Sequence, residues 1–409
     1  MRKTCFSLSF LLLTCLLIPA VAYPQPGDFK WNRGSTQFYQ VSKWDAAKRV
    51  KRIGFINNTG KLVIDFDKLP SSTHLVGEFH EGRAVIYLNP EGQPGVTGYH
   101  VGFIDESGHM VIPPRFYTAR DFSEGLAYVT GHDFQGFIDL QGKPAIRTDG
   151  ETRDFHEGLA AVGSAEGSGG WGYIDRSGKL VIQKQYGFAD DFSEGLAGVV
   201  VGRKFGFINQ KGEMVIPPRF TPRRGQYLWS GIVATSRFSE GLAPVTTTID
   251  SETNKVYGYI NPKGDFVIAP QFLAAQLFSE GLALAVKWEP KTKEVTRVGW
   301  IDKTGQWVVT EVQNQLPPNA FTKSFIDPRG YLDWRYSEGL VPFYIYSDQS
   351  KPLKGYMDRS GKVVIEPREF NKVGPFLGGL ARVYVKGDEG SSSDYGYINK
   401  TGQFIWRSE

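Results

Sequence analysis

One short phrase recurs along the whole chain, and this repetition constrains the fold more than any other feature. The segment DDFSEGLAGVVVGRKFGFINQKGEMVIPPRF starts at Asp190, and a near copy, DFSEGLAYVTGHDFQGFIDLQGKPAI, starts at Asp121. Self-similarity at a period of about 20–50 residues predicts an array of small structural units, each of which buries its apolar face against its neighbours. The chain of 409 residues is long enough for such an array.

Two motifs alternate within the repeat. The first reads Gly, aromatic, Ile, Asx, two further residues and Gly, followed by an apolar run, with Met357 in place of Ile in one copy. Its nine copies start 34 to 56 residues apart, at Gly54, Gly102, Gly136, Gly172, Gly206, Gly258, Gly299, Gly355 and Gly396. The second reads aromatic, any residue, Glu, Gly, Leu, Ala, and starts at Phe79, Phe122, Phe155, Phe192, Phe238, Phe278, Tyr336 and, degenerately, Phe376.

The first motif predicts a β-hairpin. In FGFINQKGEMVI, bulky apolar residues alternate with small or polar ones on both sides of Asn209–Gly212, which is the period of a strand. Asx opens the turn and Gly closes it, as in a type I turn whose last residue is left-handed. A Pro-containing exit then ends the second strand, Phe-Ser-Glu-Gly makes another turn, and Leu-Ala-x-Val starts a third strand.

The repeat therefore predicts an all-β fold of tandem three-stranded β-hairpin repeats. Propellers typically have 4–8 blades of four strands, which nine units of three strands fit poorly. We expect an open or superhelical array, with a closed propeller-like ring as the alternative. The nine units would occupy residues 53–409, with insertions at 221–237, 287–298 and 311–335, and residues 23–52 would form an N-terminal cap.

The first 22 residues form a separate segment. Met1-Arg2-Lys3 is a basic start, residues 5–18 are almost wholly apolar, and Ala20-Val21-Ala22 supplies small residues where a signal peptidase reads. We predict a secretory signal peptide over residues 1–22 and export to the periplasm or to the extracellular space or cell surface. A retained anchor and a lipoprotein are the alternatives. The apolar core is short for a membrane span, so none is expected after cleavage.

Cleavage would change the chemistry that is available to the mature chain. It would remove both cysteines, Cys5 and Cys15, together with Arg2 and Lys3, which lowers the formal net charge from +4 to +2. A chain without thiols has no disulfide, no thiolate metal site and no cysteine nucleophile. Its nearly neutral charge argues against nucleic acid as a partner.

The repeated polar residues could be catalytic or metal-binding, but structural roles explain their pattern better. The hairpin Asp residues would suit a glycosidase, but Asn replaces Asp in four of nine copies and cannot act as a general acid. The repeated Glu residues could bind Ca²⁺ in a row, but each is better explained as an acceptor of backbone N–H bonds from its own or the neighbouring turn. The six histidines lack zinc-site spacing. We therefore expect no catalytic residue, no metal and no cofactor.

Aromatic residues in the insertions are the candidate binding residues. Loops on a rigid scaffold often carry the binding surface, and exposed aromatic rings beside Arg suit contact with protein or glycan. The alternative is that these rings only fill gaps between units. The candidates are Arg223, Arg224, Tyr227, Trp229, Trp288, Tyr331, Trp334 and Arg335.

The motifs also carry a family resemblance. GYIDRSGKLVI, which starts at Gly172, together with FSEGLAGV, which starts at Phe192, resembles the bacterial WG-repeat family, although only Trp171-Gly172 keeps the Trp-Gly pair. The resemblance implies an all-β repeat fold and a role near the cell envelope, and it implies no catalytic activity. We predict an exported, non-enzymatic repeat protein that binds another protein at or beyond the envelope. The alternative is a glycan-binding module for cell-wall or exopolysaccharide chains, and an enzyme would need the insertion at 311–335 to carry its site.

Overall fold

Strands make up all the regular structure of the molecule where it is described. The computed structural model describes residues 38–47, 50–89, 100–163, 170–221, 236–248, 255–289, 292, 294–310, 335–347, 350–386 and 394–408. In these residues the strands form seven antiparallel sheets, and neighbours in sequence are neighbours in each sheet. None of the described residues belongs to a helix long and apolar enough to cross a membrane. The all-β prediction is confirmed.

The fifth unit shows how the repeated phrase folds. β15 (Leu196–Val201), β16 (Lys204–Asn209) and β17 (Met214–Phe220) pair as a meander. The side-chain oxygen of Asn209 accepts hydrogen bonds from the backbone N–H groups of Lys211 and Glu213, both at 3.0 Å. Gly212 has a φ of +81°, a value that glycine adopts without a Cβ clash. The predicted turn, with its left-handed last residue, is confirmed.

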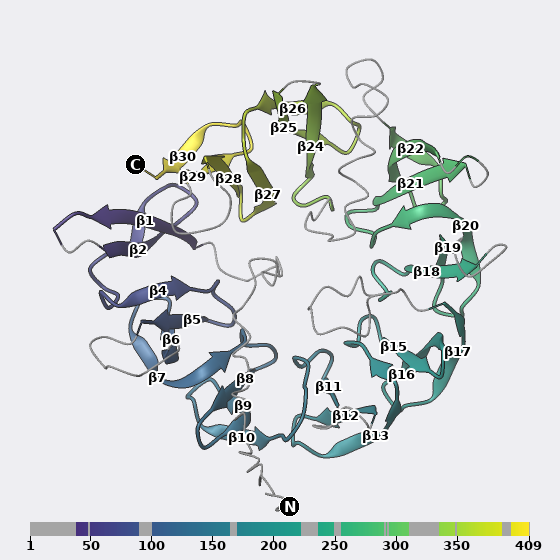
Figure 1. The fold of residues 1–409 in the computed structure, drawn as a ribbon, viewed down its shortest axis with the longest axis horizontal. Helices are drawn as coiled ribbons and strands as arrows, with labels where there is room; N and C mark the ends of the chain where they lie inside the picture. Colours follow the sequence, from purple (N-terminus) through teal and green to yellow (C-terminus); the bar gives the residue numbers. More distant parts are fainter. Residues whose placement is uncertain are drawn as a thin grey trace, which may run out of the picture.

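Nine three-stranded units of this kind follow one another in the described residues (Figure 1). They are unit 1, β1 (Tyr39–Asp45), β2 (Val50–Ile56) and β3 (Leu62–Ile64); unit 2, β5 (Arg83–Leu88), β6 (His100–Asp105) and β7 (Met110–Ala119); unit 3, β8 (Leu126–Gly131), β9 (Gln135–Asp139) and β10 (Pro144–Arg147); unit 4, β11 (Leu159–Val162), β12 (Trp171–Asp175) and β13 (Leu180–Tyr186); unit 5, β15 to β17; unit 6, β18 (Ala243–Thr248), β19 (Lys255–Ile260) and β20 (Phe266–Ala275); unit 7, β21 (Ala283–Glu289), β22 (Glu294–Ile301) and β23 (Trp307–Thr310); unit 8, β24 (Leu340–Ser347), β25 (Ser350–Asp358) and β26 (Val363–Arg368); and unit 9, β28 (Leu380–Lys386), β29 (Asp394–Asn399) and β30 (Phe404–Arg407). β1 lies within residues 23–52 and pairs with β2, so the expected boundary between cap and array falls inside the first sheet.

Units 2, 3, 5, 7 and 9 are each extended by a segment that arrives from the unit before. Phe116 of β7 pairs both with Val101 of its own unit and with Gly131 of unit 3, so β7 crosses from one unit to the next. β20 does the same between units 6 and 7. The short strands β4 (Thr73–Val76), β14 (Phe188–Ala189) and β27 (Lys372–Leu377) pair with the first strands of units 2, 5 and 9. The units therefore approach the four-stranded blade of a propeller.

The two kinds of turn lie at the same end of the units. Leu196 follows the Phe-Ser-Glu-Gly turn, here called the Glu-Gly turn, and it pairs with Asn209, which opens the hairpin turn, here called the Asx-Gly turn. Leu340 and Asp358 pair in the same way in unit 8. We call this end the turn face and the opposite end the loop face. The first two strands of each unit are joined at the loop face.

The core consists of contacts between successive units. The Asx-Gly turn of each unit lies over an aliphatic side chain of the previous hairpin, and a Cβ on Gly142 would stand 2.9 Å from Cγ2 of Ile112. Phe103 and Ile112 of unit 2 likewise pack in one cluster with Val129 and Ile138 of unit 3. The buried apolar residues of the described chain form eight such clusters, each shared by neighbouring units, so every unit is held by packing against the units beside it.

The array closes on itself. A Cβ on Gly60 of unit 1 would stand 3.0 Å from Cγ2 of Ile405 of unit 9, so the first Asx-Gly turn lies over the last hairpin, on the residue before the position used at the other interfaces. The Tyr39 hydroxyl lies 2.7 Å from the carbonyl oxygens of Leu377 and Gly378, and Tyr39 and Tyr397 pack in one apolar cluster. Figure 1 shows β1 and β30 side by side in a ring of sheets.

Ring closure decides between the two arrangements that the sequence left open. The tandem β-repeat fold is confirmed, but the preference for an open array is corrected in favour of the propeller-like ring. Counting three strands per unit led to that preference, because the crossing segments that add a fourth strand have no motif of their own. The seam between units 1 and 9 also depends on residues outside the repeat, such as Tyr39.

Candidate functional site

The repeated Glu side chains join each Glu-Gly turn to the next one around the ring. All seven have a left-handed backbone, with φ between 52° and 56°. The carboxylate of each accepts a hydrogen bond from the backbone N–H of the Gly in the following turn: Glu81 from Gly125 at 2.7 Å, Glu124 from Gly158 at 2.9 Å, Glu157 from Gly195 at 2.9 Å, Glu194 from Gly241 at 2.8 Å, Glu240 from Gly281 at 2.9 Å, Glu280 from Gly339 at 2.9 Å and Glu338 from Gly379 at 3.0 Å.

This chain of bonds assigns the Glu residues a structural role, as expected from the sequence. The Ser before the Glu adds a second link, because the Ser193 hydroxyl donates to the carbonyl oxygen of Phe238 in the next turn at 2.8 Å. The chain ends at Gly378, which takes the Glu slot of the eighth turn, and there the Tyr39 hydroxyl contacts the turn instead. Among the described residues, no group of three His, Cys, Asp or Glu side chains could hold a metal ion.

The hairpin Asp residues are likewise committed to their turns. Oδ1 of Asp175 accepts hydrogen bonds from the Ser177 hydroxyl at 2.6 Å and from the backbone N–H groups of Ser177 and Lys179. The Ser177 hydroxyl bond is the main cause that lowers the pKa of Asp175 below its usual value. Asp358 has the same partners in unit 8 and a pKa lowered for the same reason. A carboxyl held as an anion by its own turn is poorly suited to donate a proton as a general acid.

Charged residues that precede the Glu-Gly turns form a series that sequence reasoning missed. The densest part joins units 4 and 5, where Nη1 of Arg153 lies 3.2 Å from Oδ1 of Asp190 and 3.7 Å from Oδ2 of Asp191. Nε2 of His156 lies 3.7 Å from the same Oδ2 of Asp191. Asp190 is only 1% exposed, and burial raises the pKa of its carboxyl against the opposing effect of Arg153.

The series continues toward the start of the array. Arg120 pairs with Asp154 at 3.3 Å, and His80 lies 3.5 Å from Asp121. The Arg and Asp residues occupy the two positions before the aromatic residue of a Glu-Gly turn, and the His residues occupy the position directly after it. The sequence signal was the recurring acidic residue in RDFSEG, RDFHEG and DDFSEG. Since the partners come from successive units, the series serves as a set of contacts between units.

The predicted binding residues are not brought together within the described part of the chain. Arg223, Arg224, Tyr227, Trp229, Tyr331 and Trp334 lie outside the described residues. Trp288 was expected to be an exposed ring, but it lies in β21 opposite Val295 and is only 9% exposed, which corrects that prediction. The longer hairpin of unit 7 continues as strand through this position, so the ring packs against the sheet. Arg335 is half-buried just before the Glu-Gly turn of unit 8.

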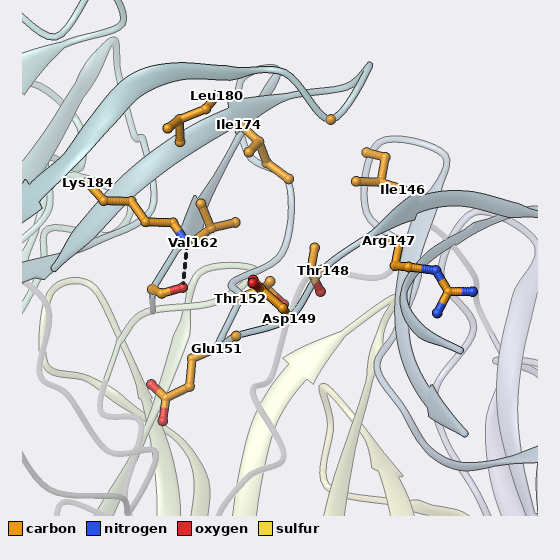
Figure 2. Close-up of a pocket in the computed structure, with 13 residues that line it drawn as sticks. Ile146, Arg147, Thr148, Asp149, Glu151, Thr152, Val162, Ile174, Leu180 and Lys184 are labelled. Atoms are coloured by element: carbon orange, nitrogen blue, oxygen red, sulfur yellow. Dashed lines mark hydrogen bonds between the residues drawn. The ribbon is translucent and has the colours of Figure 1, made fainter. Parts of the chain in front are cut away.

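A small pocket lies between units 3 and 4. Its volume is about 230 Å³, below the 300–1,000 Å³ or so of typical drug-sized ligand pockets. Figure 2 shows Ile146, Val162, Ile174 and Leu180 around it, together with Thr148 and Thr152. The Lys184 ammonium group donates to the Gly163 carbonyl oxygen at 3.0 Å at the edge of the pocket. The sequence motifs do not predict this pocket.

Comparison with known families gives a match to one repeat. The sequence model described as "WG containing repeat" matches residues 53–89, 102–130, 171–205, 205–221, 257–287 and 355–387. Each matched segment contains at least part of one hairpin or the strand before it. A search of the curated proteins finds no match.

Solved structures resemble the chain in fold. The structure titled "Crystal structure of the eukaryotic initiation factor" has a TM-score of 0.56 and 10% identity, and the match covers 91% of this chain and 96% of that one. The tricorn protease has a TM-score of 0.33 and 11% identity over 94% and 43% of the two chains. Apo AztD from Citrobacter koseri has a TM-score of 0.35 and 10% identity over 91% and 93%. At these identities the likenesses bear on the fold alone, and of these three only the first is strong enough to do so.

Proposed function

The chain belongs to the WG-repeat family, and from this premise we propose that it is an exported, non-enzymatic ring that binds another protein through its loop face. The proposal is based on one observation, which is that the turn face is made of repeated turns and the loop face of non-repeating connections. The turn face is built from repeated tight turns that are joined to one another by Glu carboxylates. Non-repeating sequence, by contrast, connects the strands at the loop face.

The insertions support the choice of the loop face. The insertion at 221–237 begins after Phe220, which pairs with Phe205 at the loop-face end of β16. The insertion at 287–298 belongs to the hairpin of β21 and β22, whose first pair at that end is Glu289 with Glu294. A rigid scaffold that gathers variable segments on one side is a common design for recognition. The aromatic and Arg residues of the first of these insertions, Arg223, Arg224, Tyr227 and Trp229, are the side chains that we propose to bind the partner.

The absence of an enzyme site rests on what the repeated carboxylates do. The Glu residues accept backbone N–H bonds, and the hairpin residues Asp175 and Asp358 are held by their own turns. The Asp190 carboxyl is buried between units beside Arg153, so it is not presented to a substrate. These assignments account for the repeated Glu and Asp carboxylates and for Asp190 without a catalytic role.

A cross-linking experiment tests the binding proposal. The mature chain from Tyr23 is incubated with envelope extract and cross-linked, and the cross-linked residues are mapped by mass spectrometry. A second protein lacks residues 222–235, which belong to the insertion that begins at the loop face after Phe220. The matched control changes exposed lysines of the turn face, Lys143→Glu, Lys179→Glu and Lys211→Glu, whose backbone N–H bonds to the turn Asx do not need the side chain.

The expected result is a protein partner cross-linked at the loop face, lost or weakened with the deletion and kept by the control. Cross-links confined to the turn face would overturn the proposal. If glycans rather than proteins are retained by the wild-type ring, the alternative of a glycan-binding module is favoured. Export is tested separately by sequencing the N-terminus of the protein from the envelope fraction. We expect Tyr23 as the first residue, and an intact Met1 in the cytoplasmic fraction would contradict export.

A further inference from the structure

One aromatic ring fills the same place at most of the described interfaces between successive units. It follows the isoleucine of the third strand of its unit by four or five residues, as Phe116 follows Ile112 in β7. Phe116 packs with Ile112 of its own unit and with Val129 and Ile138 of the next unit. The equivalent rings are Tyr186, Phe220, Phe272 and Phe370, each in a cluster with the matching residues of two units.

The interface between units 3 and 4 has no such ring. Four residues after Ile146 the chain has Gly150, and the residue that aligns with Phe116 in the strand ladder is Thr148, whose backbone N–H donates to Gln135. The matching aliphatic residues of the two units, Val162 and Ile174, are present and buried with Ile146. These three side chains line the pocket of Figure 2, so the pocket lies where the other interfaces hold an aromatic ring.

The pocket has the size and polarity for one substituted ring. An apolar cavity of roughly 150 Å³ can hold benzene, and this one measures about 230 Å³. The hydroxyls of Thr148 and Thr152 are buried without a hydrogen-bond partner, and Thr152 is only 3% exposed. An orphaned buried hydroxyl costs free energy that a ligand with a polar atom can recover. A phenol matches both halves of the pocket, because its ring meets the aliphatic residues and its hydroxyl meets the threonines.

We propose that this pocket binds the side chain of a tyrosine presented by a partner polypeptide. The rim supports a polypeptide as the source, because the exposed charged residues Arg147, Asp149 and Glu151 surround an apolar floor. An aromatic anchor in a desolvated pocket with a polar rim is the usual form of a binding hot spot. Figure 2 shows the Arg147 and Glu151 side chains directed away from the aliphatic residues, which leaves the floor open to a ring. The site is independent of the loop-face proposal.

Ligand-observed NMR with the mature chain tests the proposal. The probes are N-acetyl-tyrosinamide, N-acetyl-phenylalaninamide and N-acetyl-leucinamide, with p-cresol as the free phenol. We expect the tyrosine amide to bind best, and a short peptide that contains the tyrosine to bind at least as well as p-cresol. Thr148→Phe places a ring in the pocket and should weaken tyrosine-amide binding at least tenfold while raising the thermal midpoint. Thr152→Val should remove the preference for tyrosine over phenylalanine.

Two further variants keep the test decisive. If Thr148→Phe does not fold, Val162→Met fills the same space from unit 4 and should also abolish binding. Phe116→Ala opens the equivalent place at the preceding interface and should create a second site, with phenylalanine amide bound there. No binding of the tyrosine amide to the wild-type ring would overturn the proposal. Undiminished binding to the filled variants would overturn it as well, because the ligand would then lie elsewhere. Stronger binding of p-cresol than of the peptide would reject a polypeptide source.

Discussion

The Glu-Gly turns make a prediction that separates a structural from a chemical role for the repeated Glu. Glu124 has a φ of 55°, and its carboxylate accepts a hydrogen bond from the Gly158 N–H at 2.9 Å. We compare Glu124→Ala, Glu124→Gly and Glu124→Gln. Alanine loses the acceptor but keeps a Cβ in the left-handed conformation. Glycine loses the acceptor and removes the Cβ clash, as in the natural turn at Gly378.

The magnitudes follow from these two contributions. A hydrogen bond to a charged group contributes about 1.5–3 kcal/mol, and the partial exposure of Glu124 favours the lower end. Compared with alanine, glycine removes about 1–2 kcal/mol of strain in the left-handed conformation. It also costs about 0.4–1 kcal/mol of stability, because the unfolded chain gains conformational entropy. We therefore expect Glu124→Ala to lower the free energy of unfolding by about 1.5 kcal/mol. Glu124→Gly should be about 0.5–1 kcal/mol more stable than Glu124→Ala.

Urea unfolding followed by intrinsic fluorescence measures these differences. Glu124→Gln keeps an acceptor without the charge and should fall between wild type and alanine. Glu106→Ala, at an exposed position of an Asx-Gly turn, is the control and should stay within about 0.5 kcal/mol of wild type. A Glu124→Ala variant that is as stable as wild type, or more stable than Glu124→Gly, would refute the structural role of this carboxylate.

Three further perturbations test other parts of the account. Glu78→Gln should stabilise the protein more at pH 8 than at pH 4. Desolvation by the surrounding protein, and next the Asp121 carboxylate, raise the folded-state pKa of Glu78 to about 7. The wild type therefore loses stability as pH rises from about 4 through 7. Urea unfolding in which Glu78→Gln raises the free energy of unfolding more at pH 4 than at pH 8 would contradict this. Tyr39→Phe removes the hydroxyl at the seam and should lower the free energy of unfolding by about 1 kcal/mol, and an unchanged value would show that the bond adds nothing. Gly142→Ala should lower the thermal midpoint more than Gly158→Ala, because both have positive φ but only the former would press a Cβ against the previous unit; equal effects would argue against that contact.

The local structure could be predicted from the sequence because each motif contains its own physical cause. Asx and Gly at a fixed spacing specify the hairpin turn, as Asn209 and Gly212 show. The Glu residues could be assigned to backbone hydrogen bonds because a row of identical units leaves little room for one special carboxylate. Which backbone groups they bind required the structure, since each bond joins residues of two units, such as Glu124 and Gly158.

Closure of the ring and the pocket were harder to predict because each depends on an exception to the repeat. The seam uses Tyr39 and Gly378, which belong to no full copy of a motif. The pocket results from a missing side chain, and the loss becomes visible only when Thr148 is aligned with Phe116 through the strand ladder. Trp288 illustrates the reverse error, because a ring in an apparent insertion belongs to a longer strand. Such exceptions to the repeat are informative once the common pattern is known.

A distance measurement across the seam tests ring closure, the claim on which the rest depends. Two dyes are attached to Lys61→Cys and Gln403→Cys in the chain from Tyr23, which has no other cysteine. These exposed residues occupy the same turn position in units 1 and 9, and Lys179→Cys with Glu213→Cys in units 4 and 5 gives the matched control. A closed ring predicts the same energy-transfer efficiency for both pairs. A much lower efficiency for the seam pair would contradict closure and restore the open array.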